Sequence, residues 1–185
     1  LITGTFVVVG QVRYMQNDTA SASFKQILVL KYPSFTSDMS VKMESFKKQL
    51  LQKSYMRQVT VSGAVPGVEV ANYFTNRLYG SDQTESKLIQ MFAVDYDYLP
   101  TYSPEMVCGR GFSEAYGDEL NKVVLNEEAV RLLGFPSAEA ALGKQLSMEV
   151  VEEPLQIIGV AKNYHQQSLA VPYKPIIFFI KERVP

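Results

Sequence analysis

The apolar residues of this 185-residue chain come in short blocks that glycine, proline or polar residues soon interrupt. Blocks of this length are typical of strands, and the helical periodicities between them extend over only a few turns each. The predicted strands are residues 26–31, 57–61, 69–78, 87–94, 122–125, 155–160 and 175–180. A chain that mixes short strands with short helices in this way is predicted to adopt an α+β fold.

A helix is predicted between the first two strands. Ser37 or Asp38 can cap its start, and the helix is expected to run to about Lys53. Its apolar positions recur at spacings of three and four residues, so we expect them to share one buried face. These positions are Met39, Met43, Phe46 and Leu50. Strand, helix and strand over residues 26–61 therefore predict a compact β-α-β unit.

Two short helices are predicted in the second half of the chain. Asn126 should cap the first, with Glu127 and Glu128 in the initial turn, where carboxylates suit the positive end of the helix dipole. Gly134 should end this helix, and Ser137 should begin the next helical turn.

A glycine within a predicted strand often marks a bulge or a close approach of two backbones. Gly159 occupies such a position in the strand at residues 155–160. We therefore expect one of these two features there. A polar cluster, residues 162–165, follows at the end of the same strand.

The charges of the chain exclude one class of partner. Lysine and arginine number 18 and aspartate and glutamate 19, which gives a net charge of −1. Nucleic-acid-binding chains normally carry a clear basic excess, so no nucleic-acid partner is expected. Lys42, Lys47 and Lys48 are accordingly predicted to form the solvated side of their helix.

Residues 1–12 are uncharged, and Arg13 ends this run. As a helix they would reach about 18 Å, which is shorter than the bilayer core of about 30 Å. Two interpretations follow. The run is either a buried first strand or the outer end of a transmembrane helix.

No constellation in the sequence supports catalysis, and no catalytic, cofactor or metal site is expected. Cys108 is the only cysteine and His165 the only histidine, which excludes an internal disulfide and a metal site built on several such residues. Cys108 is predicted to be a buried residue at a strand end, and His165 a structural, hydrogen-bonding residue. Asp95 and Asp97 could serve as acid and base or hold a cation, although capping and turn roles fit them better.

Four groups of residues, spread over almost the whole chain, resemble the motifs of a known family. In order they are residues 14–17 and 26–30; 94–99 and 109–112; 123–130, 133–134 and 142–144; and 158–165, 168–169 and 172. Together they resemble the MacB-like periplasmic core domain of ABC transporter permeases of the MacB/FtsX type.

This resemblance implies an extracytoplasmic domain between the first two transmembrane helices of a permease. Residues 1–16 would then be the outer end of the first helix. Residues 17–111 and 166–185 would form a porter-like subdomain of β-α-β units, and residues 112–165 a smaller, inserted, sabre-like α+β subdomain.

The resemblance also implies a mechanical role in the bacterial inner membrane, with this domain facing the periplasm. A separate cytoplasmic ATPase domain or subunit would use ATP, which agrees with the lack of a phosphate-binding loop, because Gln145 follows Gly143-Lys144. The implied partners are this ATPase, a second permease copy, and either a periplasmic adaptor with an outer-membrane channel or a lipoprotein. The exported substrate would be a peptide, a drug or a lipoprotein, and the isolated domain is expected to be a monomer.

Two alternatives remain open. Within the same family, the domain would be a regulatory module that activates an envelope hydrolase or a sensor kinase. Outside the family, a small soluble enzyme would use Asp95, Asp97 and His165. Partner-binding residues are not identified by the sequence, since aromatic residues such as Tyr73, Phe74 or Tyr79 are equally compatible with a surface or a core position.

Overall fold

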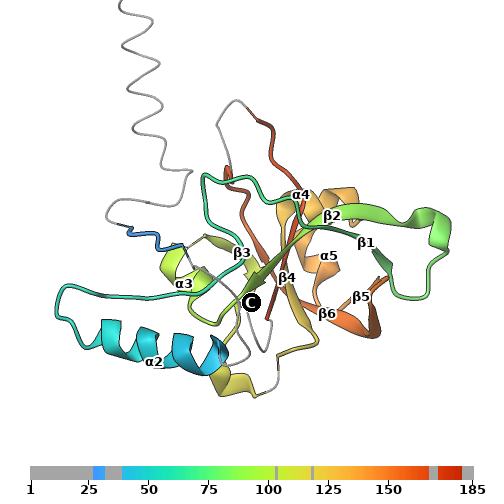
Figure 1. The fold of residues 1–185 in the computed structure, drawn as a ribbon. Helices are drawn as coiled ribbons and strands as arrows, with labels where there is room; N and C mark the ends of the chain where they lie inside the picture. The colour runs from blue at the N-terminus through green and yellow to red at the C-terminus, as the bar shows by residue number, and fades with distance from the viewer. Residues whose placement is uncertain (1–26, 32–38, 103, 118, 167–170, 181–185) are drawn as a thin grey trace, which may run out of the picture.

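A computed structural model describes residues 27–31, 39–102, 104–117, 119–166 and 171–180 (Figure 1). Its helices are α2 (Met39–Leu51), α3 (Tyr98–Tyr102), α4 (Glu127–Leu132) and α5 (Ala138–Ala141), with 3₁₀ turns at Gln83–Glu85 and Glu114–Tyr116. Its strands are β1 (Tyr73–Leu78), β2 (Lys87–Val94), β3 (Met106–Gly109), β4 (Lys122–Asn126), β5 (Gln145–Met148), β6 (Val151–Ala161) and β7 (Ile176–Ile180). The predicted α+β class is confirmed.

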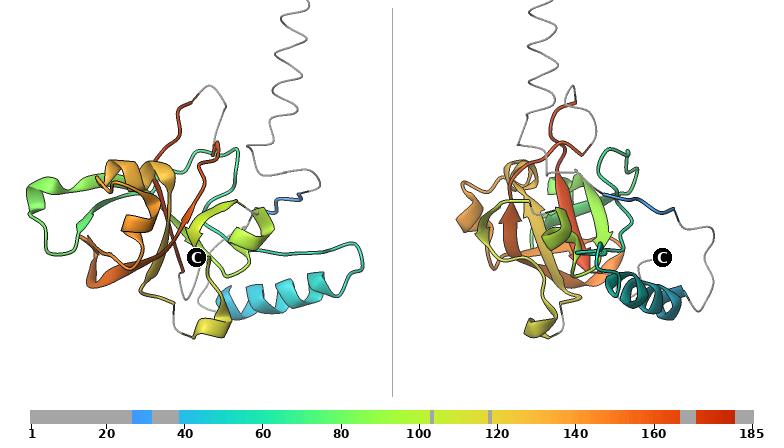
Figure 2. Two further views of the ribbon diagram at one scale, coloured as in Figure 1. Left: turned by 180° about the vertical axis from the view of Figure 1, so that it is seen from behind. Right: turned by 90° about the vertical axis from the view of Figure 1, so that its left-hand side faces the viewer.

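The strands of the described residues form one sheet that closes on itself. Their order is β3-β6-β4-β7-β2-β1-β5, and β5 also pairs with β6. The pairs β2–β7 and β4–β6 are parallel, and the others are antiparallel. β6 closes the ring because it pairs with β4 along one side and, in the first half of its 11 residues, with β5 along the other. Strand β3 pairs with the second half of β6 and lies outside the ring. The sheet is strongly coiled as a result (Figure 2).

Two apolar clusters fill the two faces of this sheet, because successive side chains of a strand point to opposite faces. On β7, Ile177 belongs to one cluster, whereas Ile176 and Phe178 belong to the other. Helices α4 and α5 cover the first cluster, and α3 with the segment after β3 covers the second. The covering residues are Ala129, Val130 and Ala141 on the first side and Tyr98, Leu99 and Phe112 on the second.

The close approach predicted at Gly159 is confirmed. The register between β4 and β6 shifts between Val123 and Val124, and Gly159 lies opposite Gly109 of β3. A Cβ atom on Gly159 would lie 2.1 Å from the carbonyl oxygen of Arg110. Gly109 has a φ of +71°, which residues with side chains seldom adopt. Strands β3 and β6 therefore meet here because neither position carries a side chain.

Several sequence predictions match the structure closely. The strand at 87–94 is β2, and the strand at 122–125 is β4 with one further residue. Asn126 caps α4 and Ser137 caps α5, each through a side-chain oxygen that accepts a backbone hydrogen bond. Gly134, with a φ of +81°, follows the end of α4. Strand β5 was not predicted, because its four residues are too few to show an alternation.

The predicted β-α-β unit over residues 26–61 is wrong. Its helix is present as α2, but residues 27–31 form no strand, and Leu28 and Leu30 are exposed. Residues 57–61 form no strand either, and their segment meets β2 through a single bridge between Ser62 and Val94. Local apolar character does not make a strand where no neighbouring strand is available for pairing.

Helix α2 is also less buried than predicted. Phe46 is 42% exposed, and Met43 and Leu50 are only half-buried. The helix stands apart from α4 and α5 and lies at the end of the molecule opposite the turn between β1 and β2 (Figures 1 and 2). The described residues of its apolar face, Met43, Phe46 and Leu50, therefore do not join either cluster of the sheet.

The division into porter-like and sabre-like subdomains stays a prediction. Strands β4, β5 and β6, from residues 112–165, lie in the same sheet as the four strands from the remaining chain. The predicted membrane-spanning end, residues 1–16, lies outside the described residues. Within the described part of the chain, no helix has the length and apolar character needed to cross a membrane.

Candidate functional site

Two of the motifs that resemble the family hold each other in the structure. The side-chain oxygen of Asn163, after β6, accepts a hydrogen bond of 3.0 Å from the backbone N–H of Glu128. The carboxylate of Glu127 in turn accepts one of 2.8 Å from the backbone N–H of Asn163. These reciprocal bonds fix the start of α4 to the end of β6.

Asn126 extends this junction to β7. Its side chain is fully buried, and its Oδ1 accepts hydrogen bonds from the backbone N–H groups of Ala129 at 2.9 Å and Ile176 at 2.8 Å. Its Nδ2 donates to the carbonyl oxygen of Lys174 at 2.8 Å. One side chain thus satisfies buried backbone groups of a helix start and a strand start. The polar residues of the motif have a structural role here.

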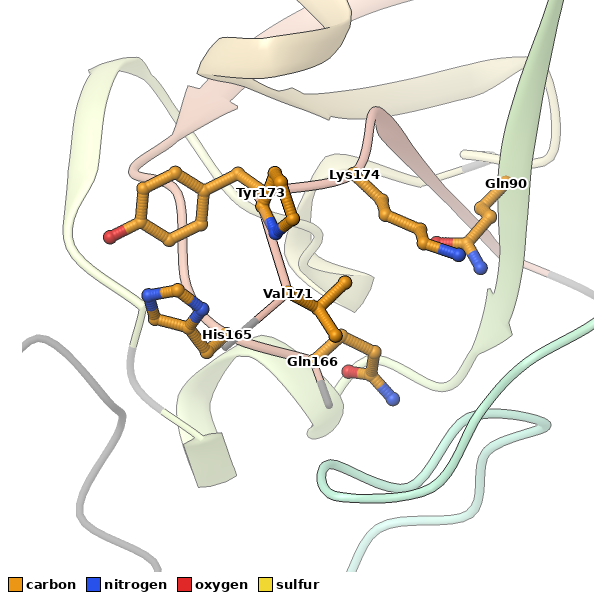
Figure 3. Close-up of a pocket in the computed structure, with 7 residues that line it drawn as sticks. Gln90, His165, Gln166, Val171, Tyr173 and Lys174 are labelled. Carbon is orange, nitrogen blue, oxygen red and sulfur yellow. The ribbon is translucent and has the colours of Figure 1, made fainter. Parts of the chain in front are cut away.

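A small pocket lies beside this junction, where the segment before β7 passes over β2 (Figure 3). It is lined by Gln90, His165, Gln166, Val171, Pro172, Tyr173 and Lys174. Gln90 is 1% exposed, and its amide nitrogen donates to the carbonyl oxygen of Val70 at 2.7 Å and to the hydroxyl of Tyr73 at 3.0 Å. Its amide oxygen has no hydrogen-bond partner among the residues that the structure describes.

Gln166 repeats this arrangement at the other side of the pocket. Its amide nitrogen donates to the carbonyl oxygens of Val65 at 2.9 Å and Val68 at 3.2 Å. Within the described part of the chain, its amide oxygen also lacks a partner. The ammonium group of Lys174 donates to the hydroxyl of Tyr73 at 3.2 Å, and this bond raises the pKa of Lys174. The pocket therefore presents two buried acceptors and one cation, and its described lining residues place no nucleophile beside a base.

The residues of the enzyme hypothesis are not brought together among the described contacts. His165 packs its ring against Tyr173, with 4.4 Å between the ring centroids. Asp95 and Asp97 instead both form ion pairs with Lys47 of α2. The hydrogen bond predicted for His165 is not among the contacts of the described residues. In this part of the chain, no three histidine, cysteine, aspartate or glutamate side chains are grouped to hold a metal ion.

Asp95 has the turn role that the sequence favoured, and a second role besides. Its carbonyl oxygen accepts a hydrogen bond from the backbone N–H of Tyr98 at the start of α3. Its carboxylate accepts from the ammonium of Lys47 at 2.7 Å, the hydroxyl of Thr60 and the backbone N–H of Val61 at 3.0 Å. Asp95 therefore joins the end of β2 to α2 and to the segment that leaves it.

The prediction that Lys47 belongs to a solvated face is wrong. Its side chain is only 21% exposed. Burial alone would lower the pKa of Lys47, but the hydrogen bonds and charges of Asp95 and Asp97 outweigh this effect and raise it. Lys48, which is 77% exposed, pairs with Glu44 of the same helix and fits the predicted solvated side.

The remaining candidate residues differ in exposure. Tyr73 is half-buried and hydrogen-bonded, Phe74 packs against a core cluster, and Tyr79 is 60% exposed. Cys108 lies in strand β3 as predicted, but it is half-buried rather than buried. Burial, together with the nearby charge of Glu139, raises the pKa of its thiol.

An ion pair with a buried carboxylate and a half-buried guanidinium was not predicted from the sequence. Glu119 is 1% exposed, and its carboxylate lies 2.5 Å from the guanidinium of Arg110 and accepts a bond from the backbone N–H of Ser113. The Arg110 guanidinium also lies 3.9 Å from the centre of the Tyr116 ring. These contacts join residues 110, 113, 116 and 119 within the connection between β3 and β4. In the sequence, no local pattern distinguishes Glu119 from a carboxylate that lies in solvent.

The fold and the site define an α+β domain whose polar residues tie strand ends, helix starts and loops to one closed sheet. The sequence pattern of the MacB-like periplasmic core domain matches residues 1–179, so the chain belongs to this family. It is the periplasmic domain of a MacB-like ABC transporter permease, and the family is not a family of enzymes.

Solved structures share this fold at low sequence identity. The periplasmic region of MacB from Actinobacillus actinomycetemcomitans is 15% identical with a TM-score of 0.53, over 91% of this chain and 70% of that one. The extracellular domain of the ABC-type transporter YknZ from Gram-positive bacteria is 16% identical with a TM-score of 0.50, over 79% of this chain and 69% of that one. Among curated proteins, none matches the chain.

Proposed function

We propose that this domain converts ATP hydrolysis by a cytoplasmic ATPase into movement on the periplasmic side of the bacterial inner membrane. In a permease of this family, the chain would continue from β7 into the second transmembrane helix. Movement of that helix would then enter the domain through β7. The exported substrate would be a peptide, a drug or a lipoprotein, handed to partner proteins.

The observation that carries this proposal is the position of β7 in the sheet. It lies between β4 and β2, and its residues Ile176, Ile177 and Phe178 are fully buried. A strand bonded on both sides and packed on both faces transmits a displacement to its neighbours, because the packed interior has low compressibility. The domain would therefore move with β7 rather than deform around it.

The partner surface is best sought at the end of the molecule away from the exit of β7. Tyr79 and Val150 are exposed there by 60% and 64%, in the turns after β1 and β5. An adaptor with an outer-membrane channel, or a lipoprotein, is the proposed partner.

Photo-crosslinking of the full-length protein in its native membrane tests the proposal. Crosslinkers are placed across residues 70–82 and 112–150, with Tyr79 and Val150 as the principal sites and Lys48 as an exposed control on α2. Recovery of an adaptor, a channel or a lipoprotein at Tyr79 or Val150, but not at Lys48, supports export. Recovery of an envelope hydrolase or a sensor kinase at the same sites favours the regulatory alternative instead.

A further inference from the structure

The exit end of β7 lies beside the end of β2. The two strands are parallel, and the last pair in their register is Val94 with Ile180. Asp95 follows Val94 directly and lies outside the strand. A displacement at Ile180 therefore reaches the backbone of Asp95 through one pair of hydrogen-bonded strands.

Asp95 is the residue that attaches α2 and the segment following it to the end of β2. Its carboxylate accepts hydrogen bonds from Lys47, Thr60 and Val61, and its backbone N–H donates to the carbonyl oxygen of Val61 at 3.2 Å. Asp97 adds a second ion pair to Lys47. Residues separated from Asp95 by 34 to 48 positions are thus gathered on one side chain.

Helix α2 is held to the domain more by its polar contacts than by its apolar ones. Phe46 and Leu51 are 42% and 44% exposed, so the helix buries little apolar surface. The Lys47 and Asp95 side chains, in comparison, are 21% and 18% exposed. Charged hydrogen bonds in such a partly buried place are directional and stronger than those between neutral groups. They fix the helix at one point, whereas most of its other described side chains are exposed.

We infer that Lys47, Asp95 and Asp97 form a clasp through which α2 follows the exit end of β7. The inference rests on the proposed function, because it assumes that β7 receives the movement of the second transmembrane helix. The clasp gives the movement a specific route through the domain. It would pass from Ile180 to Val94, from the adjoining Asp95 to Lys47, and so to α2. Lys47 is a positioning residue in this device.

Hydrogen–deuterium exchange of the full-length transporter with its ATPase, in lipid nanodiscs, tests the clasp. Exchange is compared between the nucleotide-free state and the state trapped with ATP and vanadate, for peptides covering residues 39–51 and 87–95. In the wild-type protein both segments should respond to the nucleotide. In Lys47→Met, the response should persist in 87–95 and vanish in 39–51, with basal exchange of α2 faster by up to about fivefold.

Two further variants make the result specific. Lys48→Met removes an equally long cation from the same helix and should behave like the wild type, because Lys48 pairs with Glu44 of α2. Lys47→Arg keeps the charge and should retain the response in residues 39–51. A response in 39–51 that survives Lys47→Met would overturn the clasp, as would a wild-type response confined to 87–95. If neither segment responds while ATP is hydrolysed, the clasp is overturned but the proposed coupling is not, because a domain that moves as a rigid unit need not change its hydrogen exchange.

Discussion

The closed sheet and helix α2 are held in place by different forces. The sheet encloses side chains with no exposed surface, such as Ile89, Leu125 and Ile177. In α2, none of the side chains that the structure describes is buried, and Lys47 provides two ion pairs to the rest of the domain. Apolar burial is non-directional and resists any separation of the packed elements, whereas a few polar bonds can open and close at small net cost. Apolar burial therefore holds the sheet together, whereas a small number of polar contacts holds α2 to it.

The largest effect is expected where two strands of the sheet meet without side chains. Gly159→Val would place a Cβ atom 2.1 Å from the carbonyl oxygen of Arg110, in a strand that also pairs with β4. The backbones cannot separate without breaking the sheet, so the free energy of unfolding should fall by about 3 kcal/mol or more. Urea unfolding followed by circular dichroism measures this change.

Gly63→Ala is the matched control for this substitution. The nearest atoms to a Cβ at Gly63 lie at 3.7 Å and 3.9 Å, which is ordinary contact. Its unfolding midpoint should therefore stay close to that of the wild type. Equal destabilisation by both variants would contradict the assignment of Gly159 as a site of close approach.

A smaller loss is expected when the junction of β4, α4 and β7 is opened. Asn126→Ala removes the acceptor for the N–H groups of Ala129 and Ile176 and the donor to Lys174. An unsatisfied buried donor and a lost helix cap together should cost about 2–4 kcal/mol. Differential scanning calorimetry measures the change. Ser137→Ala, which removes only the cap of α5, should cost about 1 kcal/mol, and a loss as large as that of Asn126→Ala would argue against the junction.

A substitution in α2 should change global stability little but local protection strongly, in contrast to the substitutions in the sheet. Lys47→Met should change the global free energy of unfolding by less than about 1 kcal/mol, because the ion pairs are partly solvated. Limited proteolysis between residues 52 and 58 should nevertheless become faster, since α2 loses its attachment to Asp95. Unchanged proteolysis, with Lys48→Met as the reference, would show that the clasp does not hold the helix.

The pH range of the clasp follows from the direction of the Lys47 shift. Because the carboxylates of Asp95 and Asp97 raise its pKa, the folded state binds the lysine proton more tightly than the unfolded state does. The contribution of Lys47 is therefore complete below the ordinary lysine pKa of about 10.4 and is lost as the pH rises through the raised value. Proteolysis of the wild type should be constant across neutral pH.

The smallest effect is expected for the reactivity of the Cys108 thiol in strand β3. Burial raises the pKa of Cys108, so less thiolate is present at a given pH than for a free cysteine. Alkylation by iodoacetamide should be slower in the folded protein than in urea at pH 8, and its pH profile should lie to the alkaline side. Mass spectrometry of the labelled protein measures both. Identical profiles in the folded and unfolded protein would show that Cys108 is fully solvated.

The two regions also differed in how well they could be predicted from the sequence. Strand β2 was predicted with its full bounds, because its apolar run is long and is preceded by a clear turn signal at Gly80. The caps Asn126 and Ser137 were predicted because a local hydrogen bond determines them. Around α2, in contrast, the strands at 26–31 and 57–61 were predicted from local pattern alone, and no neighbouring strand pairs with their described residues.

The polar contacts of the site depend on residues that are distant in the chain. Helical periodicity assigns Lys47 to a side of α2 but does not reveal that Asp95 and Asp97 lie opposite. Gln90 could have been noticed as a polar residue within the apolar strand 87–94, which is a weak signal for a buried hydrogen-bonded side chain. Its partners, Val70 and Tyr73, lie 20 and 17 positions away, so only the folded chain identifies them.

The central claim is that the domain moves as a unit with the state of the ATPase. Residue 79 lies at the far end of β2 from the exit of β7, roughly 23 Å along a strand of eight residues. Spin labels are placed at Tyr79→Cys in both permease copies of the full-length transporter, with Cys108→Ser to remove the native thiol. Pulsed electron paramagnetic resonance then measures the distance between them in lipid nanodiscs. If the domain moves with the ATPase, the distance distribution should differ between the nucleotide-free and vanadate-trapped states. The same distribution in both states, with ATP hydrolysis intact, would contradict it.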